Sequence, residues 1–517
     1  MELSLYLFSI LFNITFMDLN ELNDYRKFWS DYTRYQDTLA LLHWDSEVMM
    51  PEQGRNERSE QIALLSSHVH KMYTSKQFDD FIGEVKLRIP RLDPNSIQSQ
   101  HLIKEIEVLE KERNRSKKLP VELVEEFSRV TNQAHGVWAS AKKNKNFAEF
   151  KDALKRIVEL SKETAECYGY KEERYNGLLE GYEPDTKAGD LEELFKHLKN
   201  SLIPIVQEGK SYPNPFKSSV SAEYQTILNK KLPEILGLSQ DVSRLDISLH
   251  PFSTSLGSKD KRITTRISEA DPLSSIFSVL HETGHALYEY GLGTMTEFPS
   301  PISQALSYGI HESQSRLWEN QIGRSRAFWN YFYPIMLKDF QIYHYDLPFE
   351  DFFKYVNSVQ KTKIRVESDQ VTYNLHIILR FEIERELISG NLEVEELPSI
   401  WNEKMKEFFD LKIDNDAEGV LQDVHWSGGS FGYFPTYTLG NIYSAQLFHG
   451  FFSSHNNFWD DLEKRGDFSS LHKWLKINVW HQGKLRSPKE LIKEATGANP
   501  DSSYLVKYLK SKVQEQD

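Results

Sequence analysis

The sequence contains almost no cysteine and few residues that favour turns. Cys167 is the single cysteine among 517 residues, so no internal disulfide can form, and a reducing compartment is the simplest interpretation. The 25 glycines and 19 prolines make up about 8.5 % of the chain, against roughly 12 % in average proteins. Few turn-forming residues in a long chain favour long helices, and they exclude collagenous and low-complexity proteins.

Positive charge and long apolar runs are also scarce. Lys and Arg number 62 against 76 Asp and Glu, a net charge of −14, which argues against a nucleic-acid partner because phosphate binding needs a concentrated basic surface. No stretch has the apolar length of a transmembrane helix, so no membrane partner is predicted. The nearest approach, residues 1–16, lacks the basic start and cleavage site of a signal peptide, and we interpret it as an N-terminal extension before an alternative start at Met17.

Residues 17–517 are predicted to form a single, mainly α-helical domain. Apolar residues recur every three or four positions, first over residues 22–42, and a further helix is predicted over residues 369–389. One region differs, because residues 245–249 alternate apolar with polar side chains and residues 262–267 are rich in β-branched ones. These two segments predict a small β-hairpin, whose exposed edge could pair with a peptide backbone.

The most informative helix is predicted over residues 276–290 and contains the pattern HExxH. His281 and His285, four positions apart, lie on one helix face and can both reach one Zn²⁺ ion, which neutral imidazole suits. Glu282 can take a proton from a water in the open position of the site, because zinc lowers the pKa of such a water toward 7. The pattern also occurs by chance, so this assignment requires a third ligand.

Glu312 is the candidate third ligand. It follows His285 after 26 intervening residues, which is enough for a loop and the antiparallel return of a second helix. A set of two histidines and one glutamate leaves a zinc site with a net charge of +1, enough to polarise a carbonyl while still holding hydroxide. The sequence therefore predicts a catalytic zinc centre.

Together with other motifs, these residues resemble the M32 family of metallocarboxypeptidases, the carboxypeptidase Taq type. The motifs occur in the order of the family: HPF at 250–252, DxRxT at 260–264, HExxH at 281–285, HESQ at 311–314, I/VRxxAD at 364–369, GxxQDxHW at 419–426 and GYFPTY at 432–437. One departure is Ser368, which stands where the family has alanine. The resemblance covers essentially the whole chain from about residue 20, and motifs for one active site spread from His250 to Tyr437, which predicts that the chain closes around a single groove.

The resemblance implies a mostly α-helical zincin, similar to the gluzincins, with a deep active-site groove and a small sheet beside the HExxH helix. It implies a cytoplasmic homodimer that releases C-terminal amino acids from peptides with broad specificity. Carried over by motif, His281, His285 and Glu312 bind one zinc ion per subunit, which Co²⁺ can replace, and Glu282 is the general base.

An enzyme that acts at a free C-terminus must bind the α-carboxylate of its peptide substrate. Arginine suits this task because its guanidinium can form two parallel hydrogen bonds with a carboxylate. Arg365 is the first candidate for this catalytic and substrate-binding role, and Arg262 and Arg266 are the second. The competing interpretation of each is an ordinary partner of a surface acid.

Aromatic and imidazole side chains are candidates for stabilising the charge that develops on the carbonyl oxygen during hydrolysis. Tyr433 is predicted to be catalytic, and Tyr437 and His425 are predicted to bind substrate. His425 or His311 is the alternative donor, or one of them orients Glu312 and the zinc-bound water. The competing interpretation is that the aromatic loop only packs the wall of the groove.

Two other functions are compatible with the motifs. A helical oligopeptidase that cuts internal bonds would use the same zinc chemistry. A non-catalytic helical protein could instead hold a structural zinc, although a structural site seldom keeps a carboxylate base beside an open position.

Overall fold

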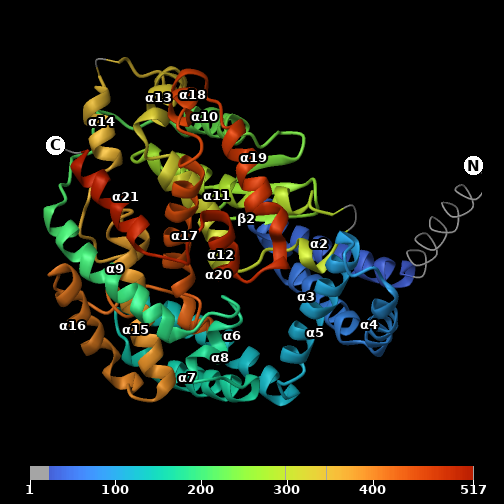
Figure 1. The fold of residues 1–517 in the computed structure, drawn as a ribbon. Helices are drawn as coiled ribbons and strands as arrows, with labels where there is room; N and C mark the ends of the chain where they lie inside the picture. The colour runs from blue at the N-terminus through green and yellow to red at the C-terminus, as the bar shows by residue number, and fades with distance from the viewer. Residues whose placement is uncertain (1–21, 297–298, 345, 516–517) are drawn as a thin grey trace, which may run out of the picture.

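The computed structural model describes residues 22–296, 299–344 and 346–515, so the predicted extension 1–16 lies outside the described residues. These residues form a mainly α-helical body with one small sheet, as predicted (Figure 1). None of the helices within these ranges combines the length and the apolar character that a bilayer crossing demands.

The first helices form a small unit beside the larger body (Figure 1). They are α2 (Asn23–Val48), α3 (Arg55–Thr74), α4 (Lys76–Arg88) and α5 (Ile97–Ser116). Their apolar stripes pack into a core of their own, which contains Leu22, Tyr25, Trp29, Tyr32, Val69, Phe78, Ile82, Val85, Leu102, Ile106 and Leu109. Ser75 and Ser96 cap α4 and α5 by accepting hydrogen bonds from backbone N–H groups in the first turn.

The remaining helices surround a second, larger core that extends from Ala134 to Leu509. They are α6 (Val121–Asn144), α7 (Ala148–Tyr168), α8 (Tyr175–Leu179), α9 (Ala188–Glu208), α10 (Ala222–Ile235), α11 (Pro272–Leu292), α12 (Tyr308–Arg316), α13 (Arg326–Phe340), α14 (Phe349–Val356), α15 (Tyr373–Ser389), α16 (Leu397–Phe409), α17 (Pro435–Phe452), α18 (Phe458–Arg465), α19 (Ser469–Asn478), α20 (Pro488–Thr496) and α21 (Ser503–Gln514). Helices α15 and α17 are buried on nearly all sides, and α12 packs along α17.

The sheet has three short strands in the order β1–β3–β2, which are β1 (Ser243–Ile247), β2 (Ser253–Ser255) and β3 (Lys261–Thr265). The predicted pairing of residues 245–249 with 262–267 as a hairpin is wrong, because β1 and β3 are parallel. The chain between them supplies β2, which is the antiparallel partner of β3. Strand β3 packs against α11, so the sheet lies beside the HExxH helix as predicted.

Two helix boundaries differ from the sequence prediction. Helix α15 begins at Tyr373 rather than at 369, because the Asp369 carboxylate accepts hydrogen bonds from the backbone N–H groups of Val371 and Thr372 in a turn. It ends at Gly390, as predicted, in a left-handed conformation that glycine tolerates. Helix α11 begins at Pro272, one turn earlier than predicted, and proline at the first position of a helix is favourable.

Candidate active site

The two helices that carry the predicted ligands lie unusually close together. His281 and His285 are on α11, and Glu312 is on α12. At their contact is Gly284, where an added Cβ atom would lie 2.6 Å from the carbonyl oxygen of Gln314 on α12. Only glycine permits this approach, so one of the two variable positions of the HExxH pattern is itself constrained.

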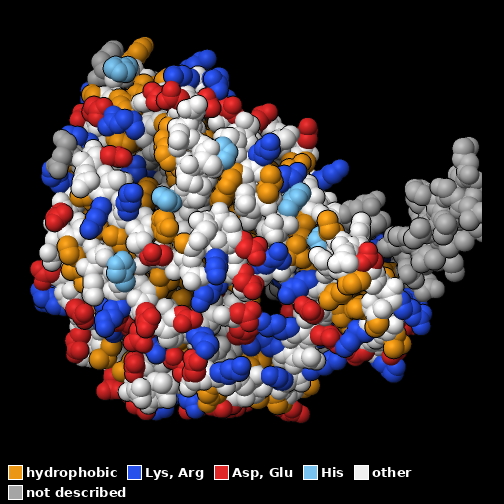
Figure 2. Space-filling view, in the orientation of Figure 1, with side chains coloured by type: hydrophobic (Ala, Val, Ile, Leu, Met, Phe, Trp, Pro, Cys, Tyr) orange, Lys and Arg blue, Asp and Glu red, His pale blue; other side chains and the backbone are white. Residues whose placement is uncertain are grey.

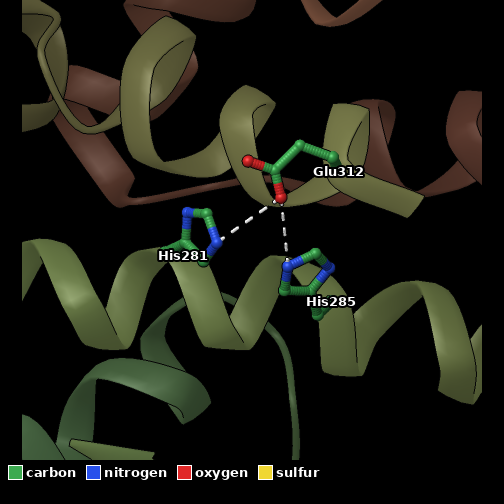
Figure 3. Close-up of side chains that lie close together, drawn as sticks. All are labelled: His281, His285 and Glu312. Carbon is green, nitrogen blue, oxygen red and sulfur yellow. Dashed lines mark ion pairs between the residues drawn. The ribbon is translucent and has the colours of Figure 1, made fainter. Parts of the chain in front are cut away.

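The predicted ligand atoms converge on one point (Figure 3). Oε2 of Glu312 lies 3.6 Å from Nε2 of His281 and 3.4 Å from Nε2 of His285. Two ligands of a tetrahedral zinc ion are about 3.3 Å apart, given zinc–ligand bonds of about 2.0–2.1 Å. The donor types and their separations therefore fit zinc.

The other ring nitrogen of each histidine is also bound. Nδ1 of His281 lies 2.8 Å from Oε2 of Glu319, which is on a π-helical turn, Leu317–Ile322, directly after α12. Nδ1 of His285 lies 2.6 Å from Nδ1 of His311, and Nε2 of His311 lies 2.9 Å from Glu289. Such partners fix the tautomer of a ligand so that its Nε2 lone pair faces the metal. The contacts of Glu319 and Glu289 with these histidines were not revealed by the sequence.

Glu312 is held in place through both of its oxygens. Arg316 donates from Nε to Oε1 at 2.7 Å, and Ser315 donates to Oε2 at 3.0 Å. Burial raises the pKa of Glu312, but the positive charges of Arg316 and His281 outweigh it and bring this pKa well below its usual range. On the far side, a Cβ atom at Gly440 would lie 2.4 Å from Cγ of Glu312, so α17 presses against this ligand. These contacts favour an ionised Glu312 carboxylate that is held by hydrogen bonds on one side and by packing on the other.

Glu282, the predicted general base, is buried beside the predicted ligands. It lines the same cavity as the three ligands, and only 8 % of its surface is exposed. Burial raises the pKa of Glu282 to about 7. A carboxyl group with a pKa near neutrality can both accept and return a proton, as a general base requires.

The ligands open onto a cavity of about 1650 Å³. Its walls include Ser253 of β2 and residues of α5, as well as Tyr433 and Tyr437. Figure 2 shows the surface hollowed between the N-terminal helices and the larger body. A cavity of this volume holds several residues of an extended peptide, and the predicted groove is present.

The predicted carboxylate-binding residue Arg365 lies behind the wall of this cavity. Its Nε and Nη2 groups donate to Oδ1 of Asp423 at 2.9 and 2.8 Å, and Arg380 donates to the second oxygen of Asp423 at 2.6 Å. The guanidinium of Arg365 lies 5.3 Å from the ring centre of Tyr437, which separates it from the cavity. Its role in binding substrate stays a prediction.

The second candidates, Arg262 and Arg266, do not line the cavity either. Arg262 donates from Nη2 to Asp260 at 2.8 Å, and its guanidinium stacks 4.8 Å from the ring centre of Trp44. It thereby joins β3 to α2 and is not among the residues that line the cavity. Arg266 is exposed at the surface.

The predicted aromatic residues form a cluster at the cavity. Tyr433 and Tyr437 contact each other with ring centres 5.2 Å apart, and Oη of Tyr437 lies 3.4 Å from Nε2 of His425. Burial raises the pKa of Tyr433 to about 12, so its phenol remains a hydrogen-bond donor at neutral pH. Tyr182 and Tyr308 join the cluster, each with its ring centre 5.4 Å from that of Tyr433. The sequence did not reveal these last two.

Comparison with known proteins agrees with this geometry. Residues 24–513 match the family described as Carboxypeptidase Taq (M32) metallopeptidase. Carboxypeptidase 1 of Bacillus subtilis is 36 % identical over 501 residues, 95 % of this chain and 98 % of the relative. Thermostable carboxypeptidase 1 of Pyrococcus furiosus is also 36 % identical, over 94 % of this chain and 96 % of the relative.

Solved structures give the same result. The M32 carboxypeptidase of Deinococcus radiodurans superimposes with a TM-score of 0.91 at 31 % identity, over 97 % of this chain and 99 % of the other. Metallocarboxypeptidase 1 of Trypanosoma cruzi gives 0.89 at 32 % identity, over 95 % and 99 %. The chain therefore belongs to the M32 family of metallopeptidases. It is a metallocarboxypeptidase, which confirms the class predicted from the motifs.

Proposed function

We propose that this protein is a zinc-dependent carboxypeptidase that removes C-terminal amino acids from peptides with broad specificity. The observation that carries the proposal is the convergence of His281, His285 and Glu312 beside Glu282 in one cavity. A zinc ion held by these ligands would supply Lewis acidity, and Co²⁺ suits the same donors.

The residues of the chain divide the remaining chemistry among them. Glu282 takes the proton of the attacking water and passes it to the leaving amine. The phenol of Tyr433 donates a hydrogen bond to the carbonyl oxygen as negative charge develops on it. Tyr437 contacts the substrate beside it, and His425 holds the Tyr437 hydroxyl at 3.4 Å.

Substrate binding combines one specific contact with sequence-tolerant ones. We retain Arg365 as the residue that binds the α-carboxylate, which requires the Tyr437 ring to turn away from it. Strand β2 is an edge strand whose Ser253 lines the cavity, so a peptide backbone can pair with it whatever its side chains. Arg262 supports this edge from β3, the neighbouring strand.

The assembly and location follow the family resemblance. We propose a homodimer in the cytoplasm with one zinc ion per subunit. The single cysteine, Cys167, is consistent with a reducing compartment.

The test uses metal-stripped enzyme reloaded with zinc or cobalt, and peptides with free or amidated C-termini. Release of single C-terminal residues from the free peptides alone is expected. The Glu282→Gln variant should bind zinc normally and lose activity by roughly 10²- to 10⁴-fold, the usual contribution of a general base. A matched control is Glu350→Gln, in an exposed ion pair with Arg326. Equal cleavage of amidated peptides would show an endopeptidase instead, and full activity of Glu282→Gln would exclude it as the base.

A further inference from the structure

One wall of the catalytic cavity carries a row of positive charges, although the whole chain has a net charge of −14. The row consists of Lys104, Lys111 and Arg115 on α5 and Lys118 in the turn after it. Their spacing of seven, four and three positions places them on one side of a helix. The row therefore faces the cavity along much of the length of α5.

The four charges differ in how far acidic residues neutralise them. Lys111 forms ion pairs with Glu180 at 2.8 Å and with Asp185 at 3.2 Å. Lys104 pairs with Glu107 at 3.4 Å. Arg115 and Lys118 take part in no ion pair within the described residues, although the Glu180 carboxylate, which also lines the cavity, lies near enough to act on the charge of Arg115.

Neutral groups hold these two cations in position. Arg115 donates from Nη2 to the carbonyl oxygen of Gly177 at 2.7 Å, and its guanidinium stacks 3.6 Å from the ring centre of Tyr168. Lys118 donates to the carbonyl oxygen of Tyr168 at 2.6 Å. Tyr168 thus fixes both side chains, one by its ring and one by its backbone carbonyl, without itself contributing a negative charge. A pair of oriented cations of this kind suits a carboxylate.

The position of Arg115 and Lys118 in the cavity indicates which carboxylate of the peptide substrate they bind. Glu282 and Glu312 are only 8 % and 7 % exposed, so the hydrolytic centre lies at the buried end of the cavity. Lys118 is exposed and Arg115 is half-buried, so the pair lies at the end open to solvent. A peptide whose last bond is at the hydrolytic centre extends its preceding residues toward that open end.

We propose that Arg115 and Lys118 form a subsite for acidic side chains upstream of the scissile bond, so that the enzyme prefers peptides with Asp or Glu there. This inference rests on the proposed carboxypeptidase function. The competing source of the same chemistry is the α-carboxylate of the substrate itself, and the two sources predict different behaviour of one variant.

The experiment compares peptides that share one C-terminal residue and differ by a single Glu or Gln at successive upstream positions. At one position the wild type should favour Glu by about three- to tenfold in kcat/KM at low salt, the usual strength of a partly exposed charge pair, and less at high salt. Arg115→Gln and Lys118→Gln should each reduce this preference and leave the Gln peptides unaffected. If Arg115→Gln folds poorly, Arg115→Lys, which keeps the positive charge, can be measured in its place. The matched control is Lys117→Gln, which pairs with Asp79 and does not line the cavity.

Each outcome of this experiment either supports or overturns the proposed subsite. Equal turnover of Glu and Gln peptides by the wild type would overturn the subsite and leave the proposed function standing. Equal loss on all peptides in Arg115→Gln would show that the residue binds the α-carboxylate, which also overturns the upstream subsite. If the wild type releases no C-terminal residue at all, the proposed function fails and the subsite fails with it.

Discussion

A single added carbon at Gly284 should disturb the metal site without touching any ligand. In Gly284→Ala the new Cβ atom would lie 2.6 Å from the carbonyl oxygen of Gln314 and 2.7 Å from Cα of Ser315. Both are backbone atoms of α12, so no side chain can move aside. Restoring ordinary contact at 3.4 Å requires α11 and α12 to separate by about 0.8 Å.

This separation acts directly on the ligands, because the two histidines are on α11 and Glu312 is on α12. The distances between their ligand atoms, now 3.4 and 3.6 Å, would then lengthen further beyond the roughly 3.3 Å of a tetrahedral zinc site. We expect zinc affinity to fall about 10- to 100-fold, the range seen when supporting residues of a metal site are changed. Overpacking should also lower the free energy of unfolding of the apo-protein by about 1–3 kcal/mol.

The assay is titration of metal-free protein with zinc against a chelating indicator, together with urea unfolding of the apo-protein. The matched control is Gly136→Ala on α6, where the new Cβ meets nothing within 4 Å. This control should keep its zinc affinity and gain up to about 1 kcal/mol from helix propensity. If Gly284→Ala bound zinc as tightly as the wild type, the closeness of the two helices would not be what sets the ligand geometry.

Two further predictions concern buried charges. Burial raises the pKa of Glu183 from its ordinary 4.5 to about 7, so the folded protein binds this proton more tightly than the unfolded chain does. The contribution of Glu183 to the free energy of unfolding is therefore full below pH 4.5 and falls by about 3 kcal/mol as the pH rises to 7. Glu183→Gln cannot ionise and should lack this fall in urea titrations at pH 5 and pH 8; identical pH dependence in both proteins would contradict the burial argument. Asp423→Asn leaves the buried guanidinium groups of Arg365 and Arg380 without their shared anion, and should cost about 3–5 kcal/mol by the same measurement. Its control, Asp414→Asn in an exposed pair with Lys363, should cost less than about 1 kcal/mol, and similar losses in both would refute the role of burial.

The clustering of the three predicted ligands could be anticipated from the sequence because their relation is local. His281 and His285 share a helix face through the helical period alone, and Glu312 needs only one loop and one return helix. The family resemblance then assigned the same three residues. The structure also shows why Gly284 must be glycine. The reason is the close packing of the neighbouring helix α12, which a local sequence pattern cannot describe.

The partners of the ligands could not be predicted, because they depend on packing. Glu319 reaches His281 from a π-helical turn, and a helix with ordinary α-helical spacing would place it differently. Arg365 is a further example, since its partner Asp423 lies 58 residues away along the chain. From its sequence motif it was expected in the cavity, and its buried ion pair places it behind the wall.

The sheet shows a different limit of sequence reasoning. Alternating side chains in residues 245–249 and β-branched residues in 262–267 identified the two strands, but neither signal carries information about the direction of pairing. The three residues of β2 are too few to show a period. Because β2 reverses the chain between β1 and β3, those two strands run parallel.

The two separate hydrophobic cores have a consequence for how the molecule opens. The smaller core lies within residues 22–109 and the larger begins at Ala134, so each can lose its packing without exposing the other. Sections of a protein with independent cores behave as separate cooperative units in native-state hydrogen exchange. Amide protons of α2–α4 should accordingly exchange sooner than those of α11, α12 and α17. Because α11 and α12, which carry the predicted ligands, pack into the larger core, these ligands would stay together while α2–α4 unfold and refold beside them.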